Sequence, residues 1–161
     1  MNISAQAVIA TIKLNLLRRP LLHAETIKDV LDIKRNDLMA MIESGELAWA
    51  WDIGLSPRNQ EVRILAHCLC ERQFGPLAGI GATKNLALPE VLKLFLPQTR
   101  SQLRGRELQR LLGCTPDQLR KLSQAGELTK VEESLPTDGP LCSPHFTRES
   151  VVKFFARRRI E

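Results

Sequence analysis

The first apolar positions of the chain recur at helical spacing. The pattern predicts a helix from about Ser4 to Arg19, which ends before Pro20 because proline cannot continue a helix. The predicted apolar face of this helix consists of Val8, Ile9, Ile12 and Leu16.

The apolar pattern of residues 27–47 returns without a gap in residues 108–128. Both segments end on the phrase Gly-Glu-Leu, at Gly45 to Leu47 and at Gly126 to Leu128. Apolar residues coincide at Ile27/Leu108, Val30/Leu111, Leu31/Leu112, Ile33/Cys114, Leu38/Leu119, Met41/Leu122 and Leu47/Leu128. Self-similarity at a fixed spacing indicates two copies of one structural unit.

The second copy carries clear local signals for two short helices. The first is expected to end at Leu112, with Gly113 in a sharp turn and Cys114 in the core. Residues 115–118, Thr-Pro-Asp-Gln, form a capping box with proline at the first helical position of the second helix. That helix is expected to end near Ala125, where Gly126 adopts a left-handed conformation. Two short helices joined by a tight turn are a helix-turn-helix.

With LLGCTPDQLRKLSQAGEL at its centre, the second copy resembles the winged helix-turn-helix of the excisionase and MerR-type group. The resemblance implies a two-stranded wing, formed by 128–133 and 142–147 around the turn LPTDGP, and a closing helix over 149–159. The expected fold is mostly α with small β wings: two tandem winged helix-turn-helix domains, residues 1–97 and 98–161, preceded by the N-terminal helix.

A second alignment predicts how the first copy closes. Residues 85–95, NLALPEVLKLF, align on residues 145–155, HFTRESVVKFF, so the first copy is expected to close with this strand and helix. The spacing between the copies then changes from 81 to 60 residues, which places about twenty-one extra residues in the first wing, within about 54–84. The segment EVRILAHCLCERQF there predicts an inserted helix.

Charge distinguishes the two copies. Residues 1–80 hold 9 Lys and Arg and 9 Asp and Glu, whereas residues 81–161 hold 14 and 9, so the second half carries the whole net charge of +5. A basic half beside a neutral one suggests a polyanionic partner for the second copy.

The resemblance implies that the second helix of each copy enters the major groove of double-stranded DNA. Buried Leu119 and Leu122 would leave a polar face outward, and the alternative is that this face is only solvated. Candidate DNA-contacting residues in the second copy are Thr115, Asp117, Gln118, Arg120, Lys121 and Gln124, with Arg104, Arg106, Arg148, Arg157 and Arg158 around them. The first copy offers Lys34, Arg35 and Asn36, followed by apolar and acidic residues, so it either binds DNA through its first turn or has a protein-interaction or packing role.

The stretch AWAWD, residues 48–52, alternates like a β-strand and places Trp49 and Trp51 on one face. Tryptophans at such positions are usually core residues, here expected against the inserted helix. The alternative is that they are exposed and anchor a protein partner.

No catalytic, metal or cofactor motif emerges from the sequence. The chain has no Tyr, its three His lack an arranged nucleophile, and GIGATKN does not have the spacing of a phosphate-binding loop. His67, Cys68 and Cys70 are adjacent on one predicted helix and point in different directions, so we expect reduced, buried thiols. We also expect no secretory leader, no membrane span and a cytoplasmic, nucleoid-associated protein.

These patterns together predict a non-enzymatic, sequence-specific DNA-binding protein, a transcriptional regulator of a bacterial or mobile-element system. One alternative is an excisionase-like factor that bends DNA. Another is an adaptor subunit whose first domain binds a protein partner or a second copy of the chain.

Overall fold

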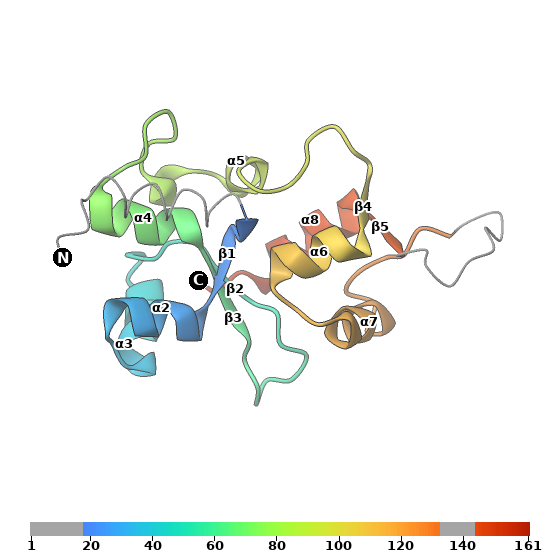
Figure 1. The fold of residues 1–161 in the computed structure, drawn as a ribbon, viewed down its shortest axis with the longest axis horizontal. Coiled ribbons are helices and arrows are strands. Elements are labelled where there is room, and N and C mark those ends of the chain that lie inside the picture. Colours follow the sequence, from blue (N-terminus) through green and yellow to red (C-terminus); the bar gives the residue numbers. More distant parts are fainter. Residues whose placement is uncertain (1–17, 133–143) are drawn as a thin grey trace, which may run out of the picture.

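The computed structural model describes residues 18–132 and 144–161, and within them two similar halves follow one another (Figure 1). We call them the first and second repeat. The first repeat comprises β1 (Leu21–His23), α2 (Ala24–Leu31), α3 (Arg35–Glu43), β2 (Ala50–Asp52), β3 (Val62–Leu65) and α4 (Ala66–Phe74). The second repeat comprises β4 (Gln102–Arg104), α6 (Gly105–Leu112), α7 (Pro116–Gln124), β5 (His145–Thr147) and α8 (Arg148–Arg158). The linker between them contains the short 3-10 helix η1 (Thr83–Asn85) and α5 (Leu88–Lys93).

Backbone conformation confirms the repeat at the turn between the paired helices. Gly113 follows α6 with φ 58° and ψ 41°, and Asp32 follows α2 with φ 52° and ψ 49°. Both residues are therefore left-handed, a conformation that costs little for glycine and more for any residue with a Cβ. After the second helices, Gly45 and Gly126 have φ of 75° and 76°. The same two turns are thus built in both repeats.

Strand pairing shows that the first repeat closes with β3 and α4. Strand β1 pairs antiparallel with β3, with Leu21 opposite Leu65, as β4 pairs with β5, with Gln102 opposite Thr147. Helices α4 and α8 follow these strands directly. The segment predicted as an inserted helix is therefore the closing helix of the first repeat. The alignment of 85–95 on 145–155 instead paired the linker helix α5 with α8, because both helices begin with a similar apolar pattern.

The first wing is consequently not enlarged, contrary to the expectation for residues 54–84. Ala50 faces Ile64 across the first wing, and Lys130 faces Phe146 across the second. These partners are 14 and 16 residues apart, so the first wing is the shorter one. We call its tip, residues 53–61, the first hairpin.

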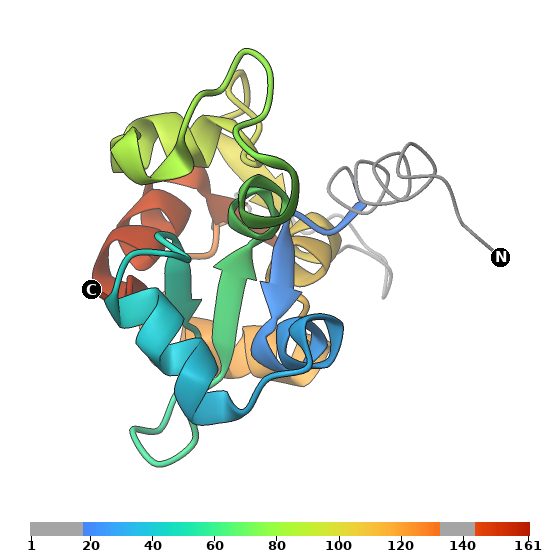
Figure 2. The same cartoon turned by 90° about the vertical axis from the view of Figure 1, so that its left-hand side faces the viewer.

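The hydrophobic core runs through both repeats without interruption. Strands β1, β3 and β2 lie side by side in that order (Figure 2), and α8 of the second repeat packs on β2. The end of the chain continues along β2, where the Ile160 amide donates to the carbonyl of Ala50 at 2.9 Å. Within the described residues, this one large core serves both repeats, and the other buried cluster, Ala66 with Cys70, is small.

The chain thus forms a mixed α/β structure with two small antiparallel sheets and seven α-helices in its described part. The closing helix predicted at 149–159 is α8, and the predicted second helix is α7. Most of the N-terminal helix predicted at 4–19, and the turn LPTDGP of the second wing, lie outside the described residues. Within 18–132 and 144–161, every helix is too short or too polar to cross a membrane.

Candidate nucleic-acid interface

Helix α7 begins at a capping box that the sequence predicted correctly. The backbone amide of Gln118 donates to Thr115 Oγ1 at 3.2 Å, and the amide of Thr115 donates to Gln118 Oε1 at 2.8 Å. These bonds satisfy two amides that a helix start leaves unpaired. Leu119 and Leu122 are buried, which leaves the face with Asp117, Arg120 and Gln124 exposed.

Asp117 holds both cationic side chains of α7. One carboxylate oxygen accepts from Arg120, and the other lies 2.9 Å from Lys121 Nζ. The hydrogen bond from Arg120, followed by that from Lys121, lowers the pKa of Asp117 below its usual value. All three side chains are about half exposed, so the pairs are weak in water. Any acceptor on DNA would therefore compete with Asp117 for these two cations.

The first hairpin lies against one side of α7. A cavity of about 210 Å³ separates them, with Leu55 and Asn59 on the hairpin side and Lys121 and Leu122 on the helix side. Gln118 Nε2 donates to both oxygens of Glu61, at 2.8 and 3.0 Å. Gln118, predicted to read a base, instead joins the two repeats, because its amide is shared between the capping box and Glu61.

Arg148 and Arg158, two of the predicted DNA-contacting residues, also make contacts within the protein. Arg148 Nε donates to the carbonyl of Pro97 at 3.0 Å, which fastens the linker to α8. Arg158 binds Glu127 at 2.7 Å and the carbonyl of Gly54 at 2.9 Å, so it joins α8 to the first hairpin. Sequence alone did not reveal these contacts, because the partners are far apart in the chain. Pro97 lies 51 residues before Arg148, and Gly54 lies 104 residues before Arg158.

The remaining predicted arginines of the second repeat lie on its surface. Arg157 is exposed and binds Glu127 at 3.1 Å. Arg104 and Arg106 are exposed around the start of α6. These side chains lie on β4, α6 and α8, outside α7 itself.

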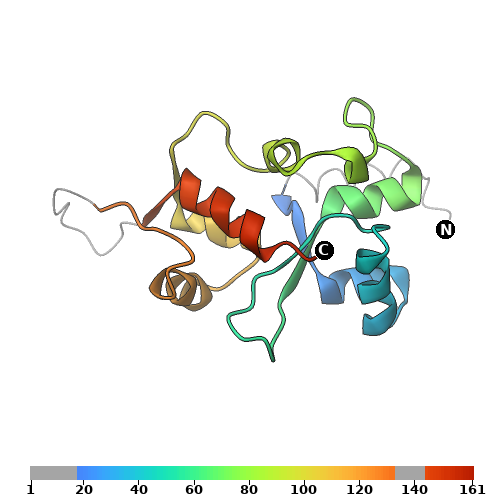
Figure 3. The same ribbon diagram turned by 180° about the vertical axis from the view of Figure 1, so that it is seen from behind.

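In the first repeat, Lys34, Arg35 and Asn36 are all exposed at the start of α3. Arg35 Nη1 lies 3.6 Å from Glu25 Oε1, a loose and exposed pair. Helices α3 and α7 lie on the same side of the molecule, and the first hairpin projects between them (Figures 1 and 3). The structure therefore brings the two predicted helices to one surface.

Sequence reasoning missed Arg58, which is exposed in the first hairpin. The hairpin turns at Ser56, whose carbonyl accepts from the amide of Asn59 at 3.0 Å. The sequence does carry a signal, since Pro57, Arg58 and Asn59 make a turn sequence between two strand-like runs. The second alignment obscures that signal because it places this segment in an insertion.

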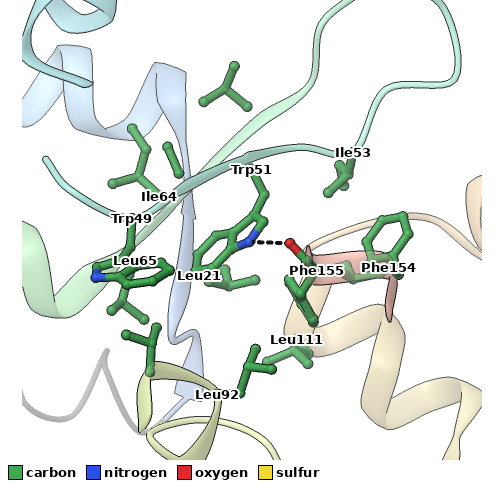
Figure 4. Packing of buried hydrophobic residues seen from close by; sticks show 14 of the residues in the cluster. Leu21, Trp49, Trp51, Ile53, Ile64, Leu65, Leu92, Leu111, Phe154 and Phe155 are labelled. Atoms are coloured by element: carbon green, nitrogen blue, oxygen red, sulfur yellow. Dashed lines mark hydrogen bonds between the residues drawn. The ribbon is translucent and has the colours of Figure 1, made fainter. Parts of the chain in front are cut away.

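Trp49 and Trp51 are core residues, with 1% and 0% of their surfaces exposed. Trp49 Nε1 donates to the carbonyl of Thr83 at 2.8 Å, and Trp51 Nε1 donates to that of Phe155 at 3.0 Å (Figure 4). The guanidinium of Arg159 lies 3.9 Å from the ring centroid of Trp49 and covers it. The prediction of burial is confirmed, although the neighbours are α8 and the linker, and neither indole is accessible as a protein anchor.

The cysteines of the described segments are free. Burial raises the pKa of Cys70 and of Cys114 to about 11, so both remain protonated thiols at neutral pH. Among residues 18–132 and 144–161, no three His, Cys, Asp or Glu side chains are grouped to hold a metal ion. The expectation of buried thiols is confirmed at Cys68 and Cys70, while Cys114 is half-buried.

Comparison with family models, with curated proteins and with solved structures finds no match to this chain.

Proposed function

We propose that this protein binds double-stranded DNA in a sequence-specific manner, as two tandem winged helix-turn-helix units of the excisionase and MerR type, and regulates transcription without catalysing a reaction. The observation that carries the proposal is the shared placement of α3 and α7. They are the second helices of two equivalent repeats, they lie on one side of the molecule (Figures 1 and 3), and each carries exposed cations.

Helix α7 supplies the base contacts in this proposal. Its exposed Arg120 suits the O6 and N7 acceptors of guanine, and Gln124 suits the edge of adenine. Lys121 approaches a phosphate once it leaves Asp117. The capping box at Thr115 fixes the start of the helix, so these side chains are presented on a rigid element.

The first repeat contributes phosphate contacts. Lys34 and Arg35 lie in the first turn of α3, where the helix dipole adds a favourable field for an anion. The same turn also contains Asp37, which accepts from the amide of Lys34, and α3 ends at Glu43, so the net positive charge of α3 is lower than that of α7. The first hairpin, which projects between the two helices in Figure 1, carries the exposed Arg58 as a third cation of the first repeat.

Selection of bound duplexes from a random DNA pool, followed by footprinting of the selected site, tests the proposal. Two helices on one side predict protection of two successive major grooves, about 10 base pairs apart. The variant Arg120→Ala/Lys121→Ala should lose specific binding, whereas Lys93→Ala, which removes one exposed cation on α5, should bind as the wild type does. Failure of the wild-type chain to enrich any sequence would contradict the proposal.

The same duplex separates a plain regulator from an excisionase-like factor. A binding site placed at different positions along a probe changes the mobility of the complex only if the protein bends DNA. The regulator predicts little variation in mobility, and the architectural factor predicts strong variation. Exposed tryptophans would have supported the adaptor alternative. Trp49 and Trp51 are buried, so they give it no such support.

A further inference from the structure

An open cavity of about 820 Å³ lies between the N-terminal side of β1 and the C-terminal end of α6, and no residue of α3 or α7 lines it. Figure 1 shows the end of α6 directed at β1. The cavity is lined by Arg18, Arg19, His23, Gln109, Arg110 and the turn at Gly113 and Cys114. Its lining thus contains three arginines and no carboxylate.

Within the described segments, these three arginines have no acidic partner. The ion pairs there involve other cations, such as Arg35, Arg72, Arg100, Arg120 and Arg158. Residues 1–17, which precede Arg18, include neither Asp nor Glu. The positive charge of the cavity is therefore left without compensation from these parts of the chain.

The pKa of His23 reflects the positive charge around the cavity. Burial lowers the pKa of its imidazole first, and the charges of Arg63 and Arg19 lower it further, against a smaller opposing effect of Glu61. A hydrogen bond with the backbone of Gly113 also opposes the lowering. An anion in the cavity would relieve this repulsion.

We propose that this cavity binds a phosphate-bearing small molecule of nucleotide size, through Arg18, Arg19 and Arg110. Guanidinium groups bind phosphate oxygens through two parallel hydrogen bonds and suit multiply charged phosphates. The volume falls in the range of small-molecule sites, about 300–1,000 Å³, and exceeds what a single phosphate requires. The inference does not depend on DNA binding, since neither Arg120 nor Lys121 of α7 lines the cavity.

The position of the cavity places such a ligand next to the turn that precedes α7. Its floor includes Gly113 and Cys114, the turn that sets α7 relative to α6. The same turn is held by Arg63 of the first repeat, whose Nη2 donates to the Gly113 carbonyl at 3.1 Å. A bound phosphate would therefore touch the joint between the two repeats.

Calorimetric titration of the full chain with ADP, and separately with inorganic pyrophosphate, tests the proposal. We expect one saturable site for each probe, with affinity reduced at least tenfold in Arg19→Gln/Arg110→Gln. Lys93→Gln, which removes a cation of α5 outside the cavity, should leave both affinities unchanged. Absence of saturable binding by both probes, or equal binding by the double variant, would overturn the proposal.

Three further measurements distinguish the source of the phosphate and guard against a misfolded variant. If the double variant weakens duplex DNA binding while neither small probe binds, the occupant is the DNA backbone and the proposal is wrong. Nuclear magnetic resonance titration of the wild-type chain should show the pKa of His23 rising when ADP is present, and an unchanged pKa would also overturn it. The Arg120→Ala/Lys121→Ala variant should still bind ADP, so failure of the DNA proposal remains separate.

Discussion

Arg63 on β3 donates from Nε to the carbonyl of Leu112, the last residue of α6, at 2.6 Å. Its Nη2 reaches the neighbouring carbonyl of Gly113 at 3.1 Å and lies 3.5 Å from Glu61. Only 3% of Arg63 is exposed. A guanidinium of the first repeat thus caps the end of a helix in the second, where carbonyls are otherwise unpaired.

Replacing Arg63 should therefore destabilise both repeats together. Arg63→Met keeps most of the volume but leaves two carbonyls and Glu61 without their buried donor, which costs about 2–4 kcal/mol. Urea denaturation followed by circular dichroism and by tryptophan fluorescence should show one coincident transition at lower urea. Arg58→Met, on the exposed hairpin, should change the free energy of unfolding by less than about 0.5 kcal/mol. A shift in one signal alone would contradict a shared core.

The equivalent left-handed positions, Asp32 and Gly113, should respond to substitution in opposite directions. At Gly113 a Cβ would meet His23 Nε2 at 2.7 Å, in addition to left-handed strain of about 1–2 kcal/mol, so Gly113→Ala should destabilise the protein by at least that amount. Asp32→Gly removes the left-handed strain, but glycine loses more conformational entropy on folding. The net effect should be an increase of about 0.5 kcal/mol in the free energy of unfolding. Thermal unfolding measures both, and a stabilising Gly113→Ala would refute the close approach to His23.

Asp117 should restrain the affinity of α7 for DNA. Asp117→Asn releases Arg120 and Lys121 and removes one negative charge, so DNA affinity at low salt should rise.

For Arg120→Ala/Lys121→Ala, the magnitude of the slope of log K against log salt should fall by about 0.9 for each phosphate that the variant no longer neutralises. Lys34→Ala/Arg35→Ala should give a smaller loss of affinity. An unchanged salt slope in the α7 double variant would remove this helix from the interface.

Stability should fall on mild acidification because of His23 and His67. Burial lowers the pKa of both from 6.5, and positive charge from Arg63 and Arg19 adds to the effect at His23. The unfolded chain takes up these protons at a higher pH than the folded chain does. Their contribution is therefore complete above pH 6.5 and decreases as the pH falls towards the lower, folded pKa values.

Urea denaturation at about pH 7.5 and about pH 5.5, on either side of the unfolded pKa, should thus show a smaller free energy of unfolding at the lower pH. His67 Nδ1 is buried without a hydrogen-bond partner in the described structure, so the charged form is poorly accommodated there. The His67→Gln variant has no imidazole at that position and should lose less stability between the two pH values. Equal or greater loss in this variant would show that His67 does not titrate as described.

Local patterns in the sequence predicted much of the second repeat. The end of α6 at Leu112, the capping box at Thr115 and the left-handed Gly126 all depend on residues within a few positions of one another. Such signals are readable because capping and turn conformation are local. The same reasoning failed for the closing element of the first repeat, because α5 and α4 are both short helices with apolar faces, and pattern alone does not choose between them.

The sequence by itself determined that the chain carries one helical unit twice, that the excess positive charge belongs to the second half, and that Leu119 and Leu122 point inward. Tertiary structure decided which strands pair, and hence that β3 and α4 close the first repeat. It also committed Gln118, Arg148 and Arg158 to contacts within the protein and gathered Arg18, Arg19 and Arg110 around one cavity. These outcomes depend on backbone and side-chain groups far apart in the chain, whose pairing is set by how the core packs and not by local conformational preference.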